Sequence, residues 1–79
     1  MIRTKVTARV RDLILGFTYY EPDELTEDTQ LDLDSLDIAE LMQGLENEFG
    51  IEVEDRLRLE DIESVRTIVS FVDRTDRSP

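Results

Sequence analysis

The sequence contains no cysteine and no histidine among its 79 residues. Without these ligands the usual zinc and iron–sulfur sites are excluded, as are disulfides, a cysteine nucleophile and a Ser-His-Asp triad. The N-terminal segment has no apolar run of signal-peptide or membrane-span length, since Arg9, Arg11 and Asp12 interrupt it. We therefore expect a cytoplasmic protein that has no membrane span and little of the chemistry of small enzymes.

Positive charge is missing from most of the chain. Residues 12–55 carry 15 carboxylates and no lysine or arginine, and the whole chain has a formal net charge of −11. Nucleic acid is not expected as a partner, because phosphate binding relies on lysine and arginine that displace counterions. A basic protein surface is the natural complement, and its attraction weakens in salt. The alternative is a solubilising surface with no specific partner.

Length and composition predict one small domain. A chain of 79 residues leaves no room for a second domain, and 39% apolar residues are enough to line a small core. The apolar spacing further predicts an all-α fold, a small bundle of four helices. The third helix in chain order is short, and the other three are longer. We expect one domain over residues 1–79, with an ordered core at about 3–74 and a frayed tail at 75–79.

Two long amphipathic helices are predicted in the first 50 residues. The first spans the apolar positions from Val6 to Phe17, with Thr4 as its cap and Gly16 as its end. The second follows Ser35 and has apolar residues three or four positions apart up to its predicted end at Gly50: Ile38, Leu41, Met42, Leu45 and Phe49. Asp34 is its expected cap, and Asp37 places a second carboxylate in the first turn.

A long connection and two shorter helices complete the predicted fold. Residues 18–34 show no sustained period and are expected to form an ordered loop, held to the core by Leu25, Leu31 and Leu33. Residues 55–62 favour a short helical turn. Ser64 is a suitable cap for a last helix that begins at Val65.

The sequence matches neither a calcium-binding loop nor a glycine-rich phosphate-binding loop. Asp32, Asp34 and Asp37 invite comparison with a calcium loop, but Asp37 falls where that loop needs glycine and Gln43 where it needs a bidentate glutamate. The three glycines are too far apart for a glycine-rich phosphate loop. We therefore predict no metal site and no catalytic residue.

Ser35 is distinguished by its position. It lies where the long connection meets the second helix, so its hydroxyl should be exposed at the positive end of the helix dipole. A phosphate ester would be favoured there by the dipole and opposed by the neighbouring carboxylates. The alternative is that Ser35 only caps the helix.

The segment Asp34–Met42, continued by Leu45–Phe49, resembles the signature and second helix of acyl carrier proteins. The order of elements is also similar over about residues 3–74. The resemblance implies that Ser35, between Asp34 and Leu36, carries 4′-phosphopantetheine derived from coenzyme A. It further implies a carrier without catalysis of its own, which delivers acyl thioesters to fatty-acid or polyketide-type enzymes. The chain departs from the family in lacking a leucine–glycine pair before Asp34, and its basic segment Arg56–Leu59 suggests a specialised carrier.

The resemblance also implies partners and surfaces. The expected partners of this monomer are a phosphopantetheinyl transferase and basic-surfaced acyl-transferring or acyl-synthesising enzymes. Carboxylates on the second helix would dock to them: Asp37, Glu40, Glu46 and Glu48. Apolar residues that would shelter an acyl chain, or simply form the core, are Leu41, Met42, Leu45, Phe49, Val53, Ile62 and Phe71. Two alternatives stay open, an aminoacyl, D-alanyl or peptidyl carrier and an acidic helical adaptor that binds a basic protein.

Overall fold

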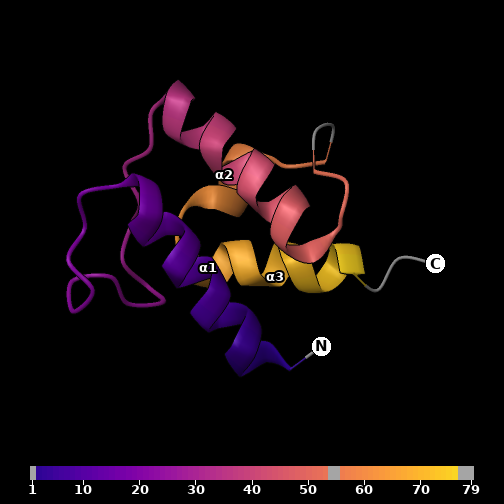
Figure 1. The fold of residues 1–79 in the computed structure, drawn as a ribbon, viewed down its shortest axis with the longest axis horizontal. Helices are drawn as coiled ribbons and strands as arrows, with labels where there is room; N and C mark the ends of the chain where they lie inside the picture. Colours follow the sequence, from indigo (N-terminus) through magenta and orange to yellow (C-terminus); the bar gives the residue numbers. More distant parts are fainter. Residues whose placement is uncertain (1, 54–55, 77–79) are drawn as a thin grey trace.

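The computed structural model describes residues 2–53 and 56–76, and these contain helices but no strand. The elements are α1 (Arg3–Phe17), α2 (Ser35–Phe49), the 3-10 turn η1 (Leu59–Ile62) and α3 (Val65–Asp76), as Figure 1 shows. The predicted all-helical bundle is confirmed in this form. The expected short third helix is a single four-residue turn, so the bundle consists of three α-helices and η1.

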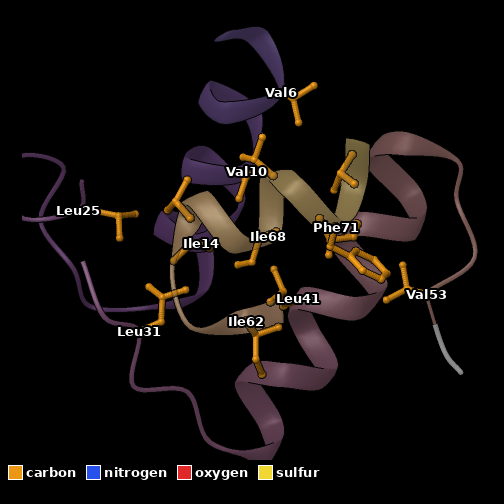
Figure 2. Close-up of a cluster of buried hydrophobic side chains, with 14 residues drawn as sticks. Val6, Val10, Ile14, Leu25, Leu31, Leu41, Val53, Ile62, Ile68 and Phe71 are labelled. Atoms are coloured by element: carbon orange, nitrogen blue, oxygen red, sulfur yellow. The ribbon is translucent and has the colours of Figure 1, made fainter. Parts of the chain in front are cut away.

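The core lies where α1, α2 and α3 meet. Helix α1 contacts both α2 and α3, and η1 packs against α3. Buried apolar side chains come from every element and also from the two connecting segments, as Figure 2 shows for most of them. They are Val6, Val10, Ile14, Leu25, Leu31, Leu41, Leu45, Val53, Ile62, Val65, Ile68, Val69, Phe71 and Val72. The helical spacing read from the sequence therefore identifies the buried faces of α1 and α2 correctly.

Helix α2 begins and ends where the sequence predicts. Asp34 accepts the Asp37 N–H at 2.8 Å, and Asp37 in return accepts the Asp34 N–H at 3.3 Å. This capping box satisfies two backbone donors that the helix itself leaves unpaired. At the other end Gly50 adopts φ 63°, a left-handed conformation that costs glycine little. The start of α3 is also confirmed, because Ser64 Oγ accepts the Thr67 N–H at 3.3 Å.

The ends of α1 differ from the prediction. Thr4 is not the cap, since the helix starts at Arg3 and the preceding Ile2 makes no side-chain capping bond. Gly16 does not end the helix either. Instead, the backbone N–H and the hydroxyl of Thr18 both donate to the Ile14 carbonyl, at 3.1 and 2.7 Å. Because Thr18 satisfies this carbonyl, the chain can leave the helix without a left-handed residue.

Helix α3 extends to Asp76, which places residues 75 and 76 of the expected frayed tail in the helix. Arg74 lies in its last turn, where a cation complements the helix dipole. Its guanidinium also pairs with the largely buried Asp61 carboxylate at 2.8 Å, which ties the end of α3 to η1. The rest of the predicted tail, residues 77–79, lies outside the described residues.

The 17-residue connection between α1 and α2 is held by hydrogen bonds as well as by Leu25 and Leu31. Arg11 on α1 donates to the carbonyls of Leu25 and Pro22, at 3.0 and 2.7 Å. Arg66 on α3 forms a two-point pair with Asp28, at 2.7 and 3.1 Å, and this hydrogen bonding lowers the pKa of Asp28. Cations from α1 and α3 thus reach an acidic segment that has none of its own.

Two helical glycines form a matched pair for a stability test. A Cβ at Gly16 would have nothing within 4 Å, whereas one at Gly44 would lie 2.5 Å from Leu13 Cδ1 and 3.0 Å from Leu13 Cγ. Gly16→Ala should stabilise the protein by about 0.5–1 kcal/mol, because alanine loses less backbone entropy in a helix. Gly44→Ala should be less stable than Gly16→Ala by about 1–3 kcal/mol, since α1 and α2 are already in contact. Urea unfolding measures the difference, and equal stabilities would contradict this view of the helix contact.

Candidate functional site

The site begins with the exposed side chain of Ser35, the first residue of α2. Asp34 occupies the capping position, so the alternative that Ser35 is merely the helix cap is wrong. Within the described residues the Ser35 hydroxyl makes no hydrogen bond. The capping box fixes the backbone on both sides of Ser35, which leaves a primary alcohol held at a defined helix end and open to a reaction partner.

Exposed apolar surface lies next to this hydroxyl. Leu36 follows Ser35 on the first turn and exposes 70% of its surface, although it is a large apolar side chain. Leu59, at the start of η1, exposes 77%. Such side chains are available for contact with a partner, and Leu36 is placed to make that contact beside Ser35.

The four carboxylates predicted to dock partners differ in their exposure and in whether they already form hydrogen bonds or ion pairs. Asp37 is half-buried and belongs to the capping box. Glu46 accepts the Val53 N–H at 3.3 Å, and Glu48 pairs with Arg9 of α1 at 3.1 Å. Glu40 is exposed and, within the described residues, has neither a hydrogen bond nor an ion pair. The structure therefore leaves Glu40 as the carboxylate of this set with an unengaged charge.

The predicted acyl-chain lining lies in or against the packed core. Leu41, Leu45 and Val53 have no exposed surface, and Ile62 and Phe71 are nearly as buried. Met42 and Phe49 are half-buried and pack against the same cluster. The structure brings these residues together as close-packed side chains. An acyl chain could enter between Leu41, Leu45 and Val53 only if the surrounding elements moved apart.

A pocket at the start of α2, lined by Asp34 and Asp37 but not by Ser35, was not predicted from the sequence. It has a volume of about 450 Å³ and lies between the end of α1, the connection and the start of α2. Its lining combines aromatic rings with carboxylates: Phe17, Thr18, Tyr19, Tyr20, Glu24, Asp32, Asp34 and Asp37. The Tyr20 hydroxyl accepts the Asp32 N–H at 3.1 Å and so fixes one wall. The adjacent tyrosines after the first helix were the available signal, but their position relative to Ser35 depends on the path of the connection.

The chain matches the family described as the phosphopantetheine attachment site over residues 8–72. The match covers most of the chain, so the protein belongs to this family of carriers, whose domain is the site of covalent 4′-phosphopantetheine attachment. The residues present fit the group, since an exposed serine hydroxyl at a capped helix start is available for esterification. Carriers of this family are tethers that work with a phosphopantetheinyl transferase and with partner enzymes.

None of the helices in the described part of the chain has the length and apolar character needed to cross a membrane. Residues 2–53 and 56–76 also contain no group of three or more acidic side chains placed to hold a metal ion. The family match favours a carrier over the alternative of an acidic adaptor without a prosthetic group.

Proposed function

We propose that Ser35 is the attachment residue and that the protein carries acyl groups as thioesters between partner enzymes. The observation that carries this proposal is the exposed Ser35 hydroxyl at the start of α2, left free because Asp34 caps the helix. The domain over residues 1–79 acts as a monomeric cytoplasmic carrier without catalysis of its own. When bound, 4′-phosphopantetheine supplies the terminal thiol on which the cargo is held.

Three features of this chain serve attachment and delivery. The capping box holds the backbone of Ser35. Its Oγ would form the ester bond to phosphorus as the diphosphate bond of coenzyme A breaks, with adenosine 3′,5′-bisphosphate leaving and taking up the serine proton. Leu36 offers an apolar contact beside the reacting atom. Glu40 presents a charge to basic patches on the transferase and on client enzymes, and this gives fast, weak and salt-sensitive docking.

An acyl cargo is favoured over an aminoacyl, D-alanyl or peptidyl one by the residue before the serine. The resemblance associates a charged residue at this position, here Asp34, with acyl carriers, whereas peptidyl and aminoacyl carriers more often have an uncharged residue. The carboxylate of Asp34 is engaged as the helix cap, so it also contributes to folding in this chain. The clients are then fatty-acid or polyketide-type enzymes.

Intact mass spectrometry tests the attachment. Incubation with coenzyme A and a phosphopantetheinyl transferase should add the mass of one phosphopantetheine to the wild type and none to Ser35→Ala. Ser70→Ala is the matched control, because Ser70 is also a helical serine but is half-buried and accepts a hydrogen bond from Arg3 at 3.2 Å. This control should be modified like the wild type. A modified Ser35→Ala protein, or an unmodified wild type, would refute Ser35 as the attachment residue.

A further inference from the structure

A groove lies on the surface between α1 and α2, which are in contact with each other. It has a volume of about 360 Å³, and four of its lining residues come from each helix. They are Asp12, Leu13, Gly16 and Phe17 on α1, and Glu40, Gln43, Gly44 and Asn47 on α2. Leu13, Phe17 and Gly44 are half-buried, whereas the four polar side chains are exposed. The groove therefore has an apolar floor and a polar rim on each side.

The two glycines contribute differently to this shape. A Cβ at Gly44 would lie 2.5 Å from Leu13 Cδ1, so the absence of a side chain there allows α2 to approach α1 closely. A Cβ at Gly16 would have nothing within 4 Å. The α1 wall is therefore open at Gly16, and another molecule can place a side chain in the space that a residue with a side chain would occupy.

The charge of the groove is entirely negative. Asp12 and Glu40 line it from opposite helices, and no lysine or arginine is among the lining residues. Within the part of the chain that the structure describes, neither carboxylate makes a hydrogen bond or an ion pair. Such a rim complements a lysine or arginine, and the floor complements an apolar side chain next to it. A second copy of this chain is disfavoured as the occupant, because its net charge of −11 would be repelled.

The groove also adjoins the exposed face of α2 that begins at Ser35. At about 100° per residue, Leu36 lies about 100° around the helix axis from Ser35, and Gly44 about 180°. Glu40, at about 140°, lies between Leu36 and Gly44. Ser35, Leu36 and Glu40 are all exposed. A protein that covers Ser35 and Leu36 therefore reaches the groove by extending around the same face of the helix.

We propose that the phosphopantetheinyl transferase places an apolar side chain in this groove, next to a lysine or arginine that pairs with Asp12 or Glu40. The inference rests on the proposed attachment at Ser35 and adds α1 to the surface that the transferase binds. The apolar contact supplies affinity that salt does not screen, whereas the contribution of the two carboxylates falls as salt rises.

Steady-state kinetics of the transferase test the apolar contact. Gly16→Leu should fill the groove and still fold, because the position is open and leucine is a good helix former. The KM for this variant should rise about tenfold at both low and high salt with kcat unchanged, a usual effect of losing one central interface contact. Ala8→Leu is the control, since it adds a leucine at an exposed position of α1 outside the groove. Its KM should equal that of the wild type.

Charge reversal on α1 tests the rim. Asp12→Lys should raise the KM about three- to tenfold at low salt, and the defect should shrink at high salt. Glu52→Lys changes the net charge by the same amount at an exposed position outside the groove, so its effect should be smaller.

The outcomes separate this inference from the attachment itself. An unchanged KM for a folded Gly16→Leu protein, or equal effects in the control variants, would overturn the groove as a docking site. If Gly16→Leu lowers the melting temperature, the comparison of Asp12→Lys with Glu52→Lys decides. Full modification of these variants after long incubation would leave the attachment at Ser35 intact, whereas a wild type of unshifted mass would overturn both.

Discussion

Replacing Leu45 with alanine is expected to destabilise the protein by about 2–5 kcal/mol, the usual cost of truncating a fully buried leucine. Leu45 lies on α2, has no exposed surface and belongs to the central apolar cluster. Domains of this size are typically stable by only about 5–15 kcal/mol, so one such substitution removes a large share of the total. The cost has two parts, the lost transfer of the side chain from water and the cavity that remains.

Leu36→Ala is the matched control, because it makes the same chemical change on the same helix. Leu36 exposes 70% of its surface, so its truncation should change stability by no more than about 0.5 kcal/mol. Urea unfolding of both variants without the prosthetic group measures the difference. A cost well below 2 kcal/mol for Leu45→Ala would mean that the position is loosely packed, and would favour its alternative role as lining for an acyl chain.

The features that the sequence predicts correctly are those determined by local chemistry. Asp34 and Asp37 are three residues apart at the start of an apolar period, and this spacing alone is enough to form the observed capping box. Gly50 follows the last apolar residue of the same period and adopts the left-handed conformation expected of it. The exposure of Ser35 is also predictable locally, since this residue precedes the apolar positions of the helix and its cap is Asp34.

Most of the features that the sequence does not reveal depend on contacts between distant segments. The end of α1 is a local exception, because the Thr18 hydroxyl donates to the Ile14 carbonyl four residues back and ends the helix without glycine. A helical projection predicts that the Glu48 carboxylate is free to bind a partner, but Arg9 of α1 forms an ion pair with it. The pocket at Asp34 and Asp37 combines residues of α1, the connection and α2. Arg11 helps to hold that connection through two backbone carbonyls, and no periodicity encodes these bonds.

Charge reversal at Glu40 is expected to slow transfer of the prosthetic group roughly three- to tenfold at low salt, because a steering carboxylate is replaced by a repelling ammonium. Glu40 is exposed, and within the described residues no hydrogen bond or ion pair engages its carboxylate. Stability should therefore change by no more than about 0.5 kcal/mol. The defect should shrink as salt rises, since the screening length falls from about 10 Å at 0.1 M to about 3 Å at 1 M.

Glu48→Lys is the control that separates docking from net charge, because it changes the total charge of the protein by the same amount. Arg9 already neutralises much of the Glu48 field at 3.1 Å. Glu48 is also eight residues farther from Ser35 than Glu40 is, or about 12 Å along a helix axis. Transfer rates for both variants at low and high salt, beside their melting curves, should show the larger and more salt-dependent defect for Glu40→Lys. Equal defects would mean that the transferase responds to the overall charge, and a lowered melting temperature for Glu40→Lys would mean that Glu40 supports the fold.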